Sequence, residues 1–217
     1  LGLLLEASVI RWMYERPHDT FLVTIGVGLV LQQLARDIFG ARAKEVRTPT
    51  WVQGQTHVLG LDLPTNRIFI IVLAIIGVGG VAAVMKLTPI GRRIRATVQN
   101  RDLAETVGVS TRWADRATFF IGSGLAGVAG VALTLVGSTG PTLGNEYILG
   151  AFLVVVAGGV GDIKGTVIAA FGIGIIQALF EDWTSGPLAK AVVYLGIVAF
   201  LQWRPQGLFA VKTRSLA

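Results

Sequence analysis

The chain contains no cysteine and only two histidines. Without cysteine, the sequence has neither a disulfide framework nor a thiolate metal site. In the topology derived below, His18 and His57 fall on opposite sides of a membrane, so they cannot share one metal site. No H-E-x-x-H run and no G-x-x-x-x-G-K-[ST] run occurs, so hydrolytic metal chemistry has no support and any ATP hydrolysis would belong to another polypeptide.

Charged residues are also scarce. They make up 15% of the 217 residues, whereas hydrophobic residues make up 53%. Soluble domains carry about 25% charged residues and roughly 45–50% apolar ones. The mean hydropathy is +0.66, and a soluble body of this size could not bury so much apolar surface. The composition therefore argues against a cytoplasmic enzyme and against disorder, and it predicts an all-α fold, a polytopic bundle of transmembrane helices.

Apolar runs long enough to cross a bilayer recur along the chain. A spanning helix needs about 20 residues, and helices are expected because no run shows the period-2 alternation of a barrel strand. Residues 1–14 resemble the end of a helix, so we expect an N-terminally incomplete chain that forms one transmembrane domain over 1–217. The segment 147–160 is short enough to be re-entrant. The expected spans are 20–39, 67–87, 117–137, 147–160, 165–181 and 189–203.

The basic residues are distributed unevenly between the two sides of this topology. Segment 86–117 carries seven cations against three acids, and three other segments lie on its side: 11–19, 161–165 and 204–217. Together these four segments hold 13 of the 19 Lys and Arg residues. Membrane proteins concentrate Lys and Arg on the cytoplasmic side. We therefore expect segment 88–116 and the C-terminus to be cytoplasmic.

The cytoplasmic segment 88–116 is longer than a simple connection requires. Pro89 suits a first helical turn, and Gly108 suits a helix C-terminus, so one or two short surface helices are expected. The segment is either a basic loop that fixes topology and touches anionic lipid or a docking element for a cytoplasmic partner. No aromatic residue is interleaved with the arginines of 92–101, so nucleic acid is not expected. Apolar or small residues alternate with the charges at Ile94, Val98, Leu103, Ala104 and Val107.

Small residues recur every fourth position in the expected span 117–137. Gly122, Ala126 and Gly130 repeat at this spacing, as do Ser123 and Gly127, which places small residues on one stripe that is typical of close helix contacts. The same region formally matches G-x-G-x-x-G. A dinucleotide site needs that motif after a strand, so we interpret the stripe as a packing surface.

Four runs of the sequence are distinctive: TPIGRRIRATVQNRDLAETVGV at 88–109, AGVAGV at 126–131, GAFLVVVAGGVG at 150–161 and RPQGLF at 204–209. These runs resemble the permeases of branched-chain amino acid ABC transporters. Further details are similar to the urea permease subfamily: LQQ at 31–33, GDIKGTVIAAFG at 161–172 and EDWTSGPLAKAVVYLG at 181–196. The resemblance covers nearly all of 10–209.

The resemblance implies a multi-pass permease of the bacterial inner (plasma) membrane rather than an enzyme. Its expected partners are membrane lipid, a second homologous permease subunit, two cytoplasmic ABC ATPase subunits and a periplasmic solute-binding protein. This chain would bind no cofactor, because ATP and Mg would sit on the ATPase subunits. Segment 88–116 would couple to the ATPases. The residues expected to do so are Gly91, Arg92, Arg95, Gln99, Asn100, Asp102, Ala104, Glu105 and Gly108.

Polar residues inside the expected spans are candidates for the solute path. They either bond to neighbouring helices or line a route for a small neutral solute. The near absence of charge in the spans favours urea, since a zwitterion calls for charge complementarity or helix-end dipoles. A branched-chain amino acid permease is the alternative. A passive channel or an ion-driven carrier is expected less, and the lack of acidic or basic relay residues in the spans argues against the ion-driven carrier. The candidates are Thr24, Gln32, Gln33, Ser123, Thr134 and Gln177.

Overall fold

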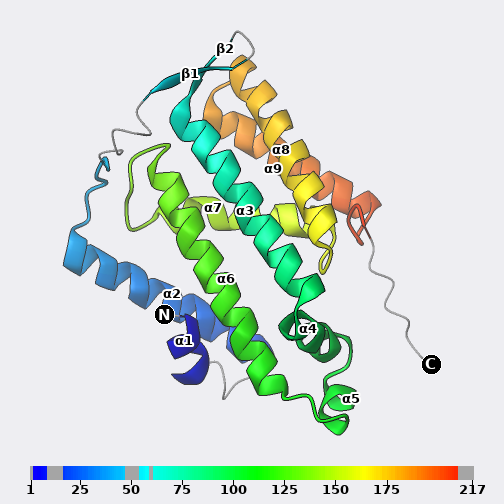
Figure 1. The fold of residues 1–217 in the computed structure, drawn as a ribbon. Helices are drawn as coiled ribbons and strands as arrows, with labels where there is room; N and C mark the ends of the chain where they lie inside the picture. Colours follow the sequence, from blue (N-terminus) through cyan, green and yellow to red (C-terminus); the bar gives the residue numbers. More distant parts are fainter. Residues whose placement is uncertain (1, 9–16, 47–53, 59–60, 210–217) are drawn as a thin grey trace. The chain divides into compact units, whose positions relative to one another are not determined.

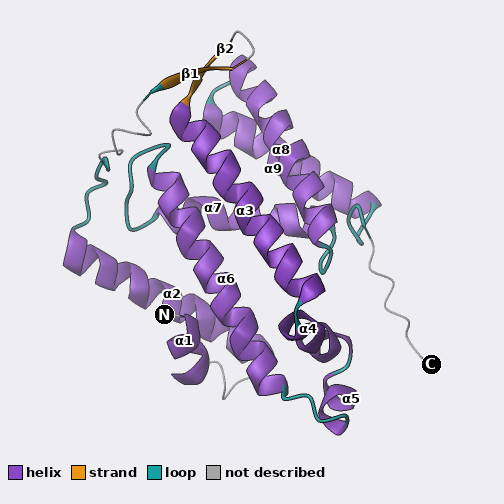
Figure 2. Cartoon of the chain, viewed as in Figure 1, coloured by secondary structure: helices purple, strands orange, loops and turns teal. Residues whose placement is uncertain are grey.

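A computed structural model describes residues 2–8, 17–46, 54–58 and 61–209 (Figure 1). These residues fall into two compact units, Leu1–Thr142 and Leu143–Ala217. Helices dominate both units, and the strands described form one short hairpin (Figure 2). Five of the helices are long and apolar enough to cross a membrane, which confirms the expected all-α membrane fold.

The first unit contains three of these long helices, α2, α3 and α6. Helix α3 begins and ends close to the expected span. Helix α6 begins at Thr111 rather than at 117, because a polar first turn precedes its apolar stretch. The elements are α1 (Gly2–Ser8), α2 (Pro17–Phe39), β1 (Gln55–Val58), β2 (Leu61–Pro64), α3 (Thr65–Leu87), α4 (Pro89–Gln99), α5 (Arg101–Thr106) and α6 (Thr111–Thr134).

The strands β1 and β2 were not expected from the sequence, which indicated only a long loop over 36–67. They pair antiparallel, with Gln55 opposite Pro64. Each strand has four residues, too few to show clear alternation. Lys44 and Thr139 exchange two backbone hydrogen bonds of 2.9 Å, and the Asn66 amide donates to the Leu135 carbonyl at 2.9 Å. The loops after α2 and α6 therefore meet at one end of the unit, as alternating spans require.

Helix α6 packs against its neighbours through Ser123 of the expected stripe and through Leu125. Gly2 of α1 lies so close to Ser123 of α6 that a Cβ atom would overlap that side chain. Leu125 faces Gly77 of α3. Gly122 and Gly130, by contrast, have open space within 4 Å of where a Cβ would sit. Among the described residues, the predicted close contact along that stripe is thus made at Ser123 and not at Gly122 or Gly130.

The second unit is a three-helix arrangement of α7 (Leu143–Gly158), α8 (Ile163–Trp183) and α9 (Gly186–Trp203). Helix α7 is apolar but has only 16 residues, and it pairs with α8 across the turn that the sequence predicts near 161–165. All three helices contribute to a small core. The buried residues of that core are Ala157, Ala169, Val193 and Ile197.

The segment after α9 closes the end of α7. The Leu208 and Phe209 amides donate to the Ala157 and Gly158 carbonyls, at 2.8 and 3.2 Å. The last carbonyls of a helix have no hydrogen-bond partner within the helix. These two bonds therefore satisfy carbonyls that would otherwise stay unpaired in apolar surroundings, which costs free energy. Gly207, at φ 75°, makes the turn that allows them. The R-P-Q-G-L-F run is therefore a helix-capping segment in this fold.

Asp162 begins α8. Its carboxylate accepts from the Lys164 and Gly165 amides, at 3.2 and 3.4 Å, which explains a charged residue in this apolar region. We expect Asp162→Ala to lower the free energy of unfolding by about 1 kcal/mol, whereas Asp162→Ser keeps a capping oxygen and most of the stability. Thermal melting of the purified protein in detergent compares the two. An equal loss in both variants would show that the cap contributes nothing.

Candidate functional site

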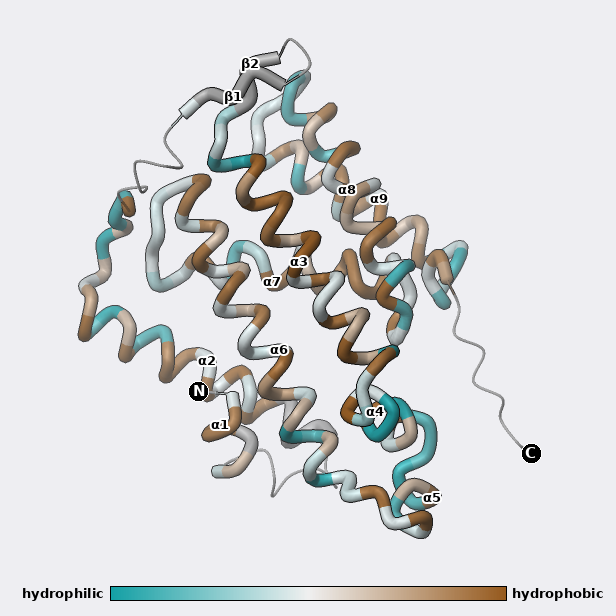
Figure 3. Tube along the Cα trace, in the orientation of Figure 1, coloured by the Kyte–Doolittle hydropathy of each residue, from teal (hydrophilic) through white to brown (hydrophobic). Residues whose placement is uncertain are grey.

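The basic segment folds into two helices, α4 and α5, beyond the end of α3. Thr88 caps α4, since its hydroxyl accepts from the Gly91 amide at 3.3 Å, and Pro89 occupies the first turn. Gly91, Ile94 and Thr97 are the buried residues of α4, three positions apart. The arginines of α4 are exposed, and Figure 3 shows the change from hydrophobic α3 to hydrophilic α4. The expectation of an amphipathic surface helix is met.

Asn100 separates the two helices and begins the second one. Its side chain accepts from the Leu103 amide at 3.0 Å. At the other end of α5, the Gly108 amide donates to the Glu105 backbone carbonyl at 3.0 Å, and the Val109 amide donates to the Ala104 carbonyl at 2.9 Å. With Gly108 at φ 82°, this is a Schellman motif. Asn100 and Gly108, both expected to face a partner, thus define where α5 begins and ends.

Helix α4 is tied to the last turn of α3. Gly91 is buried against the Met85 backbone, where a Cβ atom would overlap it. The Arg95 guanidinium donates to the Met85 carbonyl, one of the terminal carbonyls that α3 itself cannot satisfy. Gly91 and Arg95 therefore hold α4 in place, in addition to any contact with a partner.

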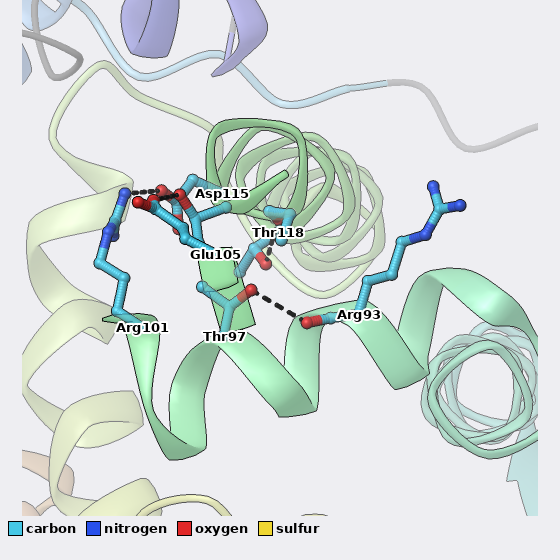
Figure 4. A network of polar contacts seen from close by, with 8 residues as sticks. Arg93, Thr97, Arg101, Glu105, Asp115 and Thr118 are labelled. Carbon is cyan, nitrogen blue, oxygen red and sulfur yellow. Dashed lines mark hydrogen bonds and ion pairs between the residues drawn. The ribbon is translucent and has the colours of Figure 1, made fainter. Parts of the chain in front are cut away.

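Both short helices are also tied to the start of α6. The Arg101 guanidinium lies 2.8 Å from the Asp115 carboxylate, and the Thr111 hydroxyl donates to Glu105. Figure 4 shows the Arg101 guanidinium reaching the Asp115 carboxylate beside α6, with the Glu105 side chain close by. The Arg93 guanidinium stacks over the Trp113 ring, 5.4 Å from its centroid. The sequence analysis did not single out Arg101, Thr111, Trp113 or Asp115, because their partners lie on a different element.

The apolar residues of the segment divide in a way that the spacing did not reveal. Ile94 and Ala104 are buried, and Ala104 is only 3% exposed. Val98, Leu103 and Val107 are instead 81%, 62% and 72% exposed. We call these three residues the exposed apolar cluster. The expected partner contact of Ala104 is therefore closed to a partner in this structure, while three apolar neighbours stand open.

The remaining expected contacts of the segment face outward. Arg92, Gln99 and Asp102 are exposed. Glu105 is exposed as well, but its carboxylate is engaged by Thr111. The segment thus offers a partner a charged surface around the exposed apolar cluster, and the assignment of individual contacts stays a prediction.

The polar residues expected to line a solute path lie on three helices. Thr24, Gln32 and Gln33 belong to α2, Ser123 and Thr134 to α6, and Gln177 to α8. Four of them bond within their own helix: Gln33 to Asp37, Ser123 to Phe120, Thr134 to Val131 and Gln177 to Glu181. Their role in a solute path stays a prediction.

A protein-family model described as the permease component of branched-chain amino acid transport systems matches residues 1–201. The chain belongs to this family. It is therefore a multi-pass membrane transport subunit. No solved structure matches it.

Curated relatives of this permease come from bacteria and from an archaeon. The high-affinity branched-chain amino acid transport permease LivH of Escherichia coli is 25% identical over 96% of this chain and 72% of its own length. The corresponding protein BraD of Pseudomonas aeruginosa is 28% identical, over 85% of this chain and 61% of its own length. A probable LivH of Methanocaldococcus jannaschii is 26% identical over 68% of this chain and 48% of its own length.

Proposed function

We propose that this permease is a membrane subunit of an ATP-driven importer and that α4–α5 is the surface on which a cytoplasmic ATPase docks. The exposed apolar cluster carries this proposal. Val98, Leu103 and Val107 expose three large apolar side chains within ten residues of a basic segment, and exposed apolar surface of this kind is typical of an interaction site. The segment also rests on both α3 and α6, so a partner that moves it acts on two spanning helices.

The assembly we propose contains a second homologous permease, two ATPase subunits and a solute-binding protein outside the membrane. ATP and Mg would be held by the ATPases. The cluster and the C-terminal segment would face the cytoplasm of a bacterium, in line with the excess of Lys and Arg on that side. ATP binding can drive transport only if it favours one permease conformation over the other.

For the solute, the names of the relatives favour a branched-chain amino acid. Urea is the second candidate. The observation that favours it is the run of spanning helices with little charge: between Arg67 and Lys86, α3 carries none. A carboxylate and an ammonium group would then have to find their partners at helix ends or on the second permease subunit.

The solute can be identified by reconstituting the permease in liposomes with the second permease, the ATPase subunits and the solute-binding protein of the proposed assembly. Proteoliposomes that enclose ATP, with the solute-binding protein added outside, should accumulate labelled leucine. Vanadate should stop this uptake. Labelled urea serves as the parallel arm. Accumulation of urea without leucine would identify urea as the solute. Solute flux that needs no ATP would contradict an ATP-driven importer.

A further inference from the structure

Helices α5 and α6 are joined by a short irregular link, 107–110. Gly108 lies in its middle at φ 82°, a conformation that glycine adopts without strain. A link of this kind allows one helix to rotate against the next unless other contacts prevent it. If α5 rotated freely, a partner docked on the exposed apolar cluster would move α5 and leave α6 where it was.

Two side-chain contacts bridge this link. Arg101 reaches Asp115 across 14 residues of sequence, with 2.8 Å between the Nη2 and Oδ2 atoms. Glu105 accepts a hydrogen bond from Thr111 across six residues. We call these four residues the α5–α6 latch. Rotation of α5 about Gly108 would separate both pairs at once.

The latch is shielded from water on its α6 side. Thr111 is buried, at 2% exposure, and the Asp115 side chain is 16% exposed, against 41% for Arg101. Fully exposed ion pairs are weakened by water and salt. Partial burial and a charged, hydrogen-bonded geometry strengthen such a contact, so this pair is suited to hold two helices together.

We propose that Arg101 and Asp115 are positioning residues that make α5 and the first turn of α6 move as one body. This inference rests on the proposed function. When the ATPase displaces α5, the latch passes the displacement to the spanning helix α6 instead of letting the link absorb it. Because the exposed apolar cluster lies outside the latch, a broken latch leaves docking and ATP hydrolysis intact while import declines.

The test compares solute imported per ATP hydrolysed in the reconstituted importer. We expect Arg101→Ala and Asp115→Ala each to lower this ratio about fivefold, the factor that corresponds to an ion pair of roughly 1 kcal/mol. The double variant should be no worse than either single one, and the exchange Arg101→Asp with Asp115→Arg should restore the ratio. Arg112→Ala is the matched control, because Arg112 is exposed and no described residue forms an ion pair with it.

A reversible cross-link separates coupling from folding. The chain has no cysteine of its own, so Arg101→Cys with Asp115→Cys gives one defined pair for a cleavable thiol cross-linker. The cross-linked importer should transport at the wild-type ratio, and cleaving the linker in the same sample should lower it. A structural role alone would change the amount of assembled protein and leave the ratio per ATP unchanged.

The outcomes are distinct. A wild-type ratio of solute imported per ATP in the single variants, or no effect of cleaving the linker, would overturn the latch. ATP-driven import by the wild-type assembly would still support the proposed function in that case. Absence of ATP-driven import by the wild-type assembly would overturn the proposed function, and the latch inference with it.

Discussion

Replacing Leu103 by aspartate is expected to release the ATPase subunits from the permease while leaving the permease folded. Leu103 is 62% exposed and belongs to the exposed apolar cluster with Val98 and Val107. Its replacement therefore leaves no cavity in the protein. At an interface, loss of a central apolar residue costs about 2 kcal/mol, which weakens association about 30-fold.

The sign of the new charge increases this effect. The exposed charges on α4 and α5 are four arginines against Asp102 and Glu105, so the surface around the cluster carries a net positive charge. A partner that fits it should present apolar and acidic groups, and like-charge juxtaposition at an interface is costly. Aspartate at position 103 would place a negative charge against the apolar and acidic groups expected on the partner.

Co-purification of the ATPase from solubilised membranes measures the outcome. Ser110→Asp is a suitable control, because it adds the same charge at an exposed position of the nearby link and removes no apolar group. Leu103→Met should retain the ATPase. If Leu103→Asp and Ser110→Asp retain equal amounts of ATPase, the docking surface lies elsewhere.

Replacing Gly207 by alanine is expected to lower the free energy of unfolding by about 3 kcal/mol, through backbone strain and lost hydrogen bonds together. Gly207 has φ 75°, and a Cβ there would approach the Val156 carbonyl and the Gly159 amide nitrogen to 2.6 and 2.7 Å. Both obstacles are backbone atoms, which cannot move aside as the end of a flexible side chain can.

The segment that follows Gly207 would then leave the end of α7. The Ala157 and Gly158 carbonyls would lose the amides of Leu208 and Phe209. In apolar surroundings an unsatisfied carbonyl is costly. We therefore expect faster amide exchange over 157–165 as well as a lower melting temperature.

Hydrogen-exchange mass spectrometry and thermal melting in detergent test both effects. Gln206→Ala is the control, since Gln206 is an exposed neighbour in the same turn. Equal exchange and melting in the two variants would show that the capping segment is not needed to hold α7 and α8 together.

The elements of this permease follow largely from local sequence. Long apolar runs fix where the spanning helices lie, because the bilayer leaves a helix as the simplest way to pair every backbone group. Local signals also mark the surface helices, through Thr88 and Pro89 at one end and Gly108 at the other. Residue spacing also predicted the amphipathic helix α4, because the alternation of apolar and charged residues can be recognised within a single helix.

What joins these elements was decided only in three dimensions. The spacing could not show that Ala104 is buried while Leu103 is exposed, because the neighbouring helices α4 and α6 determine which side of a six-residue helix is covered. Likewise, Arg101 pairs with Asp115 from another helix, and Leu208 caps a helix that ends fifty residues earlier. Such contacts depend on where distant segments meet, which a pattern read along one segment does not contain.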